Sequence, residues 1–386
     1  MSVRAFYSNL IPAAMAAFID FVGIGIVIPI SPFYAQKFGA TPLEIALLFT
    51  AYSAPQVILS PLWGRFSDRF GRKPILLIGL GGEFVSYIVL AFAPSLVYLY
   101  VSRVISGGLS ANFAVIQSYV ADVTSEERRV RGLGFIGASV GLGFIVGPAI
   151  GGTLSVYGYR TPLLLTAFLA LANLGLVLFI LKEPAIRRTS VRRPLREVFG
   201  YAKPIYVSGG LVNLAFVGLQ VTLALYVQAL YGWGAFNVGV ILAAVGVIEA
   251  FIQGGVVHSL AAKLGEWVTA SVGIGLLGVC FLALSIPLSV YATILALVLL
   301  GVGLSLAQPS ANSIITKLTP PDEYGSALSL VQSITSLTNI VGQVIGGSLF
   351  QYVSVEAPYI FGLVAVISGL LVFTTAQSRY RQPLKQ

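Results

Sequence analysis

Four ionisable side chains lie inside long apolar stretches of this sequence: Asp20, Glu83, Arg103 and Glu249. A charge at the centre of a bilayer costs about 2.5–3.5 kcal/mol on insertion scales, so each is a functional candidate by default. An apolar environment disfavours the charged form of a carboxyl group, which lets an acid there load and release a proton. Arg103 keeps its charge, and could tune a neighbouring acid or bind an anionic group.

Each of these residues also has a simpler interpretation. Asp20 could be a buried hydrogen-bonding residue, and Glu83 or Glu249 could bind a cationic substrate or hold a pair of helices together. No periodicity in the sequence shows that any two of them touch. We take Asp20 as the first candidate for a proton carrier, with Glu83 or Glu249 second.

A second group of charges lies in the ten residues from Gly64 to Lys73, which contain five of the chain's 37 charged residues (23 basic and 14 acidic). Apolar runs end near Trp63 and restart at Pro74, so we expect a short loop at a membrane surface. An ordinary basic loop is the simpler alternative. The residues of interest, with Asp122 expected on the same face, are Gly64, Asp68, Arg69, Gly71, Arg72 and Asp122.

The composition predicts an integral membrane protein. The 386 residues are 57% hydrophobic and only 10% charged, whereas soluble domains carry about 25% charged residues. One cysteine and one histidine leave no Cys- or His-based metal site. We expect no metal, no cofactor and no enzyme activity. No nucleotide-binding loop is present, so ATP is not expected as the energy source. The net charge of +9 collects in connections, which suits lipid headgroups rather than nucleic acid.

A bilayer crossing needs about 20 apolar residues, and the sequence contains twelve such segments. They lie near 8–34, 43–63, 74–93, 96–121, 131–156, 161–181, 204–230, 236–257, 267–288, 291–316, 325–352 and 357–377. The runs are long and have no alternating polar face, so the fold class is all-α rather than a barrel.

Basic residues indicate the orientation. With the N-terminus inside, 20 of the 23 Lys and Arg residues fall in cytoplasmic segments, and only Lys37 and Arg160 fall outside. Lys and Arg near helix ends are retained in the cytoplasm. We therefore expect both termini to be cytoplasmic, in a cell inner (plasma) membrane.

The two halves of the chain repeat. Residues 122–152 and 317–347 share the ending IVG-x-x-IGG at an offset of 195 residues, and a charged, proline-containing stretch divides the halves. A parallel repeat of two six-helix units is a known transporter architecture. We predict an N-terminal bundle at 1–182, a cytoplasmic linker at 183–203, and a C-terminal bundle with a basic tail at 204–386.

Polar and aromatic residues on the apolar helices are candidates to line a substrate cavity, although most could instead form hydrogen bonds between helices. They are Tyr52, Gln56, Asn112, Gln117, Asn213, Gln220, Tyr226, Gln228, Gln308, Asn312, Asn339 and Gln343.

Two motifs resemble the major facilitator superfamily. The pattern G-x-x-x-D-R-x-G-R-K from Gly64 to Lys73 resembles its signature loop between helices 2 and 3. The stretch that starts at Arg103 and ends in a glycine pair resembles its helix 4 arginine motif. The resemblance implies twelve helices in two pseudo-symmetric bundles and an ion pair between Arg72 and Asp122. We also expect Asp68 to meet the start of the eleventh helix.

A third pattern looks like the helix 5 signature of the superfamily's drug:proton antiporters. It consists of Gly143, Gly147, Pro148, Gly151 and Gly152. Glycines four residues apart let two helix backbones approach closely, and a proline favours a kink. Generic packing of small residues is the alternative.

The segment from Asp20 to Pro32 is similar to helix 1 of the tetracycline and multidrug efflux branch. In the tetracycline exporters a helix 3 carboxylate aligns with Ser86, whereas the acid here is Glu83. Glu249 has no counterpart that we can place in them. These departures argue against tetracycline itself as the substrate and leave efflux intact.

The combined expectation is a monomeric secondary transporter that exports a small lipophilic or cationic compound by proton antiport and alternating access. Its partners would be that substrate, protons and membrane lipids. Two alternatives stay open. One is a proton symporter or facilitator for a metabolite, and the other is a lipid flippase or a receptor that senses its ligand without moving it.

Overall fold

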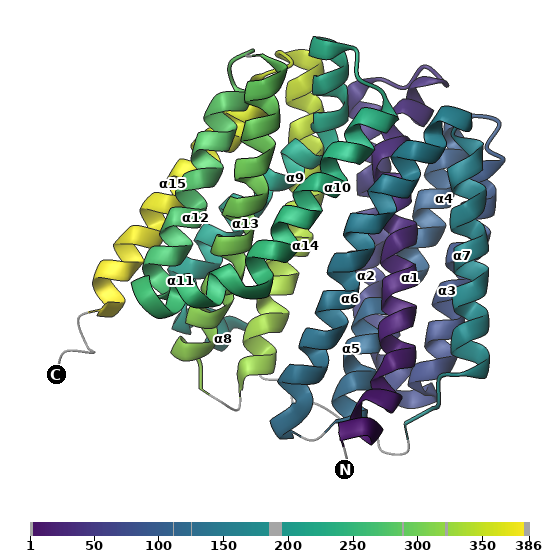
Figure 1. Ribbon diagram of the computed structural model, residues 1–386, viewed down its shortest axis with the longest axis horizontal. Helices are drawn as coiled ribbons and strands as arrows, with labels where there is room; N and C mark the ends of the chain where they lie inside the picture. The colour runs from purple at the N-terminus through teal and green to yellow at the C-terminus, as the bar shows by residue number, and fades with distance from the viewer. Residues whose placement is uncertain are drawn as a thin grey trace. The chain divides into compact units, whose positions relative to one another are not determined.

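The computed structural model describes residues 3–110, 112–124, 126–184, 195–287, 289–320 and 323–381. Within these ranges the chain is helical and contains no strand (Figure 1). Twelve segments in this part of the chain are long and apolar enough to cross a membrane. The largest differences from the predicted segments are at the ends of the second and eighth segments. We predicted ends at residues 63 and 257, whereas the helices continue for seven more residues, to Phe70 and Leu264.

The helices of the first half follow one another with short connections. They are α1 (Val3–Gln36), α2 (Pro42–Phe70), α3 (Arg72–Ala91), α4 (Leu96–Leu109), α5 (Asn112–Val123), α6 (Glu126–Leu154) and α7 (Arg160–Phe179). A 3-10 turn at Ser155–Tyr157 follows α6.

The described part of the second half contains eight α-helices and one π-helical turn. The α-helices are α8 (Leu195–Tyr201), α9 (Lys203–Tyr231), α10 (Ala235–Phe251), α11 (Val257–Leu264), α12 (Glu266–Leu284), α13 (Val290–Leu318), α14 (Tyr324–Tyr352) and α15 (Ala357–Arg381). The π-helix Ile252–Val256 joins α10 to α11.

The predicted loop at Gly64–Lys73 is wrong as a loop. Most of it is the last two turns of α2, and only Gly71 separates α2 from α3. No proline follows Pro61 in this helix, so nothing interrupts the backbone hydrogen bonds. Gly71 ends the helix because its φ of 117° lies in the region that favours glycine. The charged side chains of this stretch therefore extend from the end of α2 and the start of α3, and helical geometry fixes their spacing.

The predicted fourth segment is two helices rather than one. α4 ends at Leu109 and α5 begins at Asn112. The break frees main-chain carbonyl groups, and side chains of α2 satisfy them. Trp63 Nε1 donates to the Gly108 carbonyl at 2.7 Å, and Gln56 Nε2 donates to the Ser110 carbonyl at 3.4 Å. Irregular backbone at membrane depth is tolerated where protein groups satisfy it in this way.

The chain forms two compact units. One contains Met1–Ala40, Leu48–Ser190 and Trp233–Gly246, and the other contains Thr41–Leu47, Val191–Gly232 and Val247–Gln386. The predicted linker at 183–203 is described only in part, since 185–194 lie outside the described residues and α8 occupies most of the remainder. The domain boundaries that we drew from the sequence stay a prediction.

The helices pack in the same pairs within each unit. In the first, α1 packs on α6 and α7, and α3 packs on α4 and α7. In the second, α9 packs on α14 and α15, and α12 packs on α13 and α15. α1 and α6 are adjacent in Figure 1. Helices that correspond in the sequence repeat thus occupy corresponding places in their own units.

Glycines make one of these repeated contacts possible. A Cβ at Gly147 of α6 would lie 2.7 Å from the Cα of Gly25 in α1, and one at Gly346 of α14 would lie 2.9 Å from the Cα of Gly218 in α9. Both helix pairs therefore approach through backbone atoms, as small residues allow in membranes.

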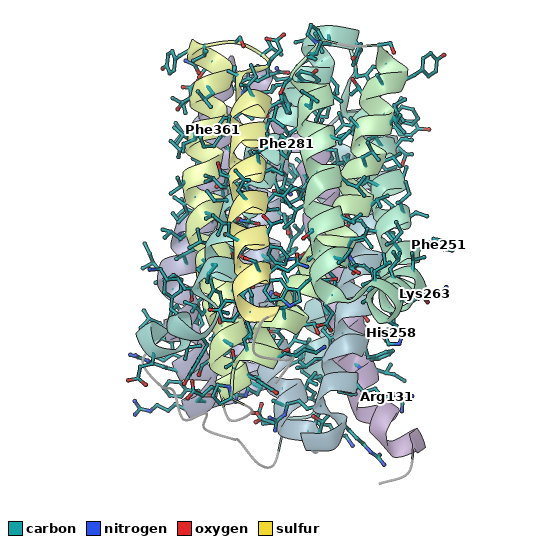
Figure 2. The ribbon with its side chains drawn as sticks, turned by 90° about the vertical axis from the view of Figure 1, so that its left-hand side faces the viewer. Arg131, Phe251, His258, Lys263, Phe281 and Phe361 are labelled. Carbon is teal, nitrogen blue, oxygen red and sulfur yellow. The ribbon has the colours of Figure 1, made fainter. Side chains whose placement is uncertain are left out.

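The core of the second unit includes aromatic side chains and the single cysteine. Phe281 of α12 is buried. Gly362 of α15 leaves room for its ring, because a Cβ there would collide with it; Figure 2 labels Phe281. Cys280, the neighbouring residue, is 0% exposed. The two residues mark the packed interior face of α12.

Candidate functional site

Two acids of the first unit are in contact. Asp20 of α1 and Glu83 of α3 are 6% and 2% exposed, and their carboxyl groups lie close enough to interact with each other. Two ionised carboxylates in this buried setting would repel each other, so the arrangement favours a proton on one of the two groups. The sequence identified both residues as proton-coupling candidates, and the fold brings them together.

Polar neighbours complete the hydrogen bonding of this carboxyl pair. Asn112 Nδ2 donates to Asp20 Oδ1 at 3.3 Å, and the Ser110 side chain is hydrogen-bonded to Glu83. Ser110 Oγ also lies 3.0 Å from the Tyr52 hydroxyl, so the network reaches α2. Asn112 and Tyr52, which we predicted as cavity residues, thus belong to the network of the acids.

A glycine on α3 makes room for the asparagine. A Cβ at Gly79 would collide with Asn112 Oδ1, so a larger residue there would push α5 away. Gly79 is four residues before Glu83 and therefore lies on the same face of α3. The network depends on the close approach of α3 to the break between α4 and α5.

Arg103 of α4 contributes a cation to the network. Its guanidinium interacts electrostatically with Glu83. Among the described residues, however, Arg103 and Glu83 form no direct ion pair. Nη2 donates weakly to Ser102 Oγ at 3.5 Å, and Nε has no hydrogen-bond partner. The arginine therefore balances charge in the network while one of its buried donors stays unused.

The position of the helix 3 acid of the tetracycline exporters has a structural role here. Ser86 Oγ donates to the Ser102 carbonyl at 2.8 Å, and Ser102 Oγ donates to the Ser86 carbonyl at 2.9 Å. Both serines are fully buried. This reciprocal pair links α3 to α4 and keeps Glu83 and Arg103 on neighbouring helices.

The glycines of the helix 5 pattern position the helix that carries Asp20. On the α1 side of α6, a Cβ at Gly143 would lie 2.8 Å from Phe21 Cβ, and one at Gly151 would meet the Ile26 carbonyl. With the Gly147 contact, three successive turns of α6 lie against α1. Pro148 and Gly152 are also buried. The pattern therefore has a packing function, whatever else it does.

Arg72 is the centre of the charged group at the end of α2. Its Nε donates to Asp122 Oδ2 at 2.8 Å, and its Nη1 donates to Asp68 Oδ1 at 2.5 Å and to Ser67 Oγ at 2.7 Å. One side chain thus joins α2, α3 and α5. The pair with Asp122 is the one that the resemblance implied.

The Arg72–Asp122 pair is buried, whereas we expected Arg72 in a loop at a membrane surface. The side chains of Arg72 and Asp122 are 3% and 1% exposed, and only Asp68 is open to solvent at 39%. Removing one member of a buried pair typically costs about 3–5 kcal/mol, because it leaves an uncompensated buried charge. The Arg72–Asp122 contact is therefore a structural element of the first unit.

A carboxylate that we did not identify from the sequence caps α3. Glu183 accepts hydrogen bonds from the main-chain N–H groups of Arg72 and Lys73 at 2.7 and 2.8 Å. In return, Lys73 Nζ donates to the Leu178 carbonyl at 2.7 Å, near the end of α7. An anion at a helix N-terminus and a cation at a C-terminus both stabilise the helix dipole. The only sequence signal was an acid directly after the sixth apolar segment.

Two residues of the charged group remain, Arg69 and Gly64. Arg69 lies 5.2 Å from the centre of the Phe70 ring. Gly64 of α2 has no neighbour that a Cβ would meet. No close contact of the backbone therefore requires a glycine at position 64.

The other predicted cavity residues are dispersed. Asn213 Nδ2 donates to Thr338 Oγ1 at 2.8 Å and to Asn339 Oδ1 at 2.9 Å, which links α9 to α14. Tyr226 is fully buried, and its hydroxyl donates to the Leu284 carbonyl at 2.9 Å. The rest are exposed (Gln117, Gln308), partly buried (Gln56, Gln220, Gln228, Asn312) or buried (Gln343).

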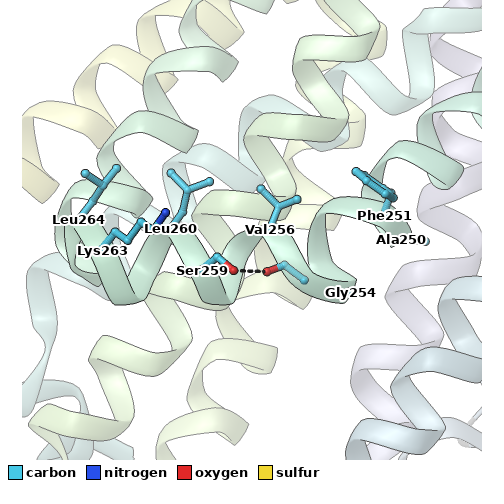
Figure 3. Close-up of a pocket in the computed structure, with 9 residues that line it drawn as sticks. Ala250, Phe251, Gly254, Val256, Ser259, Leu260, Lys263 and Leu264 are labelled. Carbon is cyan, nitrogen blue, oxygen red and sulfur yellow. Dashed lines mark hydrogen bonds between the residues drawn. The ribbon is translucent and has the colours of Figure 1, made fainter.

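A groove of about 920 Å³ lies away from the acids (Figure 3). It follows one continuous stretch from Ala250 to Leu264, through the π-helix, and Ser259 and Lys263 are its polar lining residues. None of the predicted site residues lines it. The groove is therefore the hollow side of one bent helix rather than an extension of the carboxyl network.

Comparison with known proteins places the chain in a family. The sequence profile of the Major Facilitator Superfamily matches residues 13–298 and 271–385. The tetracycline resistance protein of class B from Escherichia coli is 30% identical over 357 residues, 88% of each chain. Multidrug resistance protein 1 from Bacillus subtilis (strain 168) is 28% identical over 362 residues, 92% of each chain.

Solved structures show the same fold. The human organic anion transporter MFSD10 (TETRAN) superposes with a TM-score of 0.73 at 19% identity, covering 95% of this chain and 99% of its own. Together with the twelve candidate membrane-spanning helices among the described residues, this likeness confirms the predicted fold class. The chain belongs to the Major Facilitator Superfamily and is a multi-pass membrane transporter of the tetracycline and multidrug efflux branch, not an enzyme.

Proposed function

We propose that this transporter exports a small lipophilic or cationic compound in exchange for protons, with both termini on the cytoplasmic side of the cell membrane. Alternating access would carry the substrate out and the proton in. The names of the two relatives, a tetracycline resistance protein and a multidrug resistance protein, support export of small molecules. The coupling ion and the substrate class are our inference.

The observation that carries the proposal is the close approach of two buried carboxyl groups, those of Asp20 and Glu83. Two buried acids share a site, so ionising both would place like charges together in an apolar medium. One proton and the nearby charge of Arg103 make the group neutral. Releasing that proton leaves one net negative charge, which is costly until a proton returns. The group can therefore exist in two charge states that a transport cycle could alternate between.

A proton-release measurement tests this assignment. Purified protein in weakly buffered detergent should acidify the medium when it binds a compound that wild-type vesicles accumulate. Asp20→Asn or Glu83→Gln should lose that release, because neither amide can ionise. Glu197→Gln is the matched control, since this exposed acid of α8 lies outside the network.

Vesicle transport separates the proposal from its rivals. In inside-out vesicles, a pH gradient that is acidic inside should drive accumulation by an antiporter. A symporter would accumulate substrate under the opposite gradient, and a facilitator would ignore both. Proton release that persists in both Asp20→Asn and Glu83→Gln would exclude the carboxyl pair as the carrier.

A further inference from the structure

The eighth membrane-spanning segment, Ala235–Leu264, is longer than a bilayer crossing requires. Its first part consists of the 17 residues of α10 and the 5 residues of the π-helix Ile252–Val256. At 1.5 Å per residue this part spans about 33 Å, which already crosses a hydrocarbon core of about 30 Å. α11 is therefore not needed for the crossing, and we expect it at the edge of the hydrocarbon core.

The groove of about 920 Å³ lies along this bent stretch and has apolar walls (Figure 3). Val256, Leu260 and Leu264 are four residues apart, so they lie on one face of α11. Phe251, at the other end of the groove, is 76% exposed, and Leu264 is 47% exposed. Cβ atoms at the two glycines 254–255 would meet nothing within 4 Å, so the groove is open along its middle. An exposed apolar surface of this shape can bind an apolar chain.

The same groove carries a positive charge near one end. Lys263 is exposed, lines the groove, and forms no ion pair with the residues that the structure describes. The acids that flank the groove in the chain do not line it: Glu249 is partly buried in α10, and Glu266 is paired with Lys317 at 2.8 Å. His258, the other basic side chain of α11, does not line it either. The ammonium group of Lys263 is therefore available to a negatively charged group.

We propose that this groove binds one anionic phospholipid, with an acyl chain along Phe251, Val256 and Leu260 and the phosphate group at Lys263. The apolar wall and the cation follow one another along the groove as chain and headgroup do in such a lipid. An amphipathic helix at the edge of the hydrocarbon core lies at the depth where headgroups begin. In the orientation that the basic residues predict, Lys263 belongs to the cytoplasmic side, where anionic lipids attract basic residues. The proposal concerns a bound lipid and does not depend on the exported compound or the coupling ion.

Binding of radiolabelled phosphatidylglycerol to purified full-length protein in detergent tests the charge contact. Unlabelled phosphatidylglycerol should displace the label, and phosphatidylcholine, which has no net charge, should displace it poorly. Lys263→Gln should weaken binding about fivefold, the size expected for one lysine near an anionic lipid surface. Lys263→Arg should bind as the wild type does. Lys203→Gln is the matched control, because this exposed lysine at the start of α9 lies outside the groove and should leave binding unchanged.

The apolar wall is tested separately. Leu260→Gln keeps Lys263 and should still weaken binding, because the acyl chain loses an apolar contact. Inorganic phosphate should not displace the lipid, since it has no chain to occupy the groove. Equal binding by Lys263→Gln and Lys203→Gln would overturn the proposal, as would wild-type binding by Leu260→Gln. Displacement by phosphate would assign Lys263 to a simple anion site, and displacement by phosphatidylcholine as effective as by phosphatidylglycerol would reject charge recognition. No gradient or transported compound is used, so failure of the proposed proton exchange would leave this result standing.

Discussion

Glu183 stabilises the start of α3, and Lys73 of α3 stabilises the end of α7. The carboxylate of Glu183, which follows α7 in the chain, accepts a hydrogen bond from the Lys73 main-chain N–H at 2.8 Å. The Lys73 ammonium donates to the Leu178 carbonyl of α7 at 2.7 Å. Two contacts therefore join α3 to the α7 end of the chain. In one a carboxylate binds the start of α3, and in the other an ammonium group binds the end of α7. Gly71 permits this, because a Cβ at that position would lie 2.8 Å from Glu183 Oε1.

Glu183→Ala should lower the free energy of unfolding by about 1–2 kcal/mol, because two main-chain N–H groups at the start of α3 lose their acceptor. Thermal unfolding of purified protein in detergent measures the effect. Glu197→Ala, at an exposed position of α8, should unfold like the wild type. Equal unfolding temperatures for Glu183→Ala and the wild type would show that water replaces the carboxylate.

Arg72→Ala should be more severe, at about 3–5 kcal/mol, because it leaves the buried carboxylate of Asp122 without a counter-charge. Arg72→Ala combined with Asp122→Asn should recover part of the loss, since the double variant contains no buried unpaired charge. Arg65→Ala, at an exposed arginine near the end of α2, is the control. Additive losses in the double variant would contradict a coupled pair.

Gly147→Ala should reduce stability by about 1–3 kcal/mol and reduce transport, because the new methyl group would force α6 away from Gly25 of α1. Asp20 lies on α1, so its position relative to Glu83 should change as well. Gly141→Ala is a matched control on α6, where a Cβ meets nothing within 4 Å. Transport assays in vesicles and unfolding in detergent should both separate the two variants, and identical behaviour would reject the contact.

Arg103→Ala should abolish accumulation driven by a pH gradient, because the carboxyl pair loses its balancing charge. Arg103→Lys should retain a fraction, since a lysine can restore the charge without the planar donor geometry. Exchange of labelled for unlabelled substrate, without a gradient, should survive in both variants. Normal gradient-driven accumulation by Arg103→Ala would remove this residue from coupling.

The sequence predicted the elements of this fold better than their contacts. Hydropathy located all twelve membrane-spanning segments, because each must be apolar over a similar length. It misplaced the end of α2, since the charges after Trp63 were interpreted as a loop although no residue before Gly71 interrupts the helix. The break at Ser110 was also missed, because the side chains that satisfy its carbonyl groups come from a different helix.

For the candidate site, too, the sequence identified residues but not the contacts between them. Composition singled out Asp20, Glu83 and Arg103 as charges in apolar segments, and no periodicity could show that they share one network. Glu183 escaped notice because an acid at the end of an apolar segment is unremarkable until its two N–H partners are seen. The Arg72–Asp122 pair was anticipated from family resemblance and not from spacing.

The burial of Cys280 has a practical consequence for following the transport cycle. The chain has one thiol, and it is 0% exposed in the packed face of α12. Spectroscopic labels attached to cysteines introduced at exposed positions would therefore meet little competing reaction in the folded protein. Pairs of labels, one on each unit, could report distances in protein whose native sequence is otherwise unaltered. The native cysteine therefore need not be removed before distances between labels are measured in different conformations of the protein.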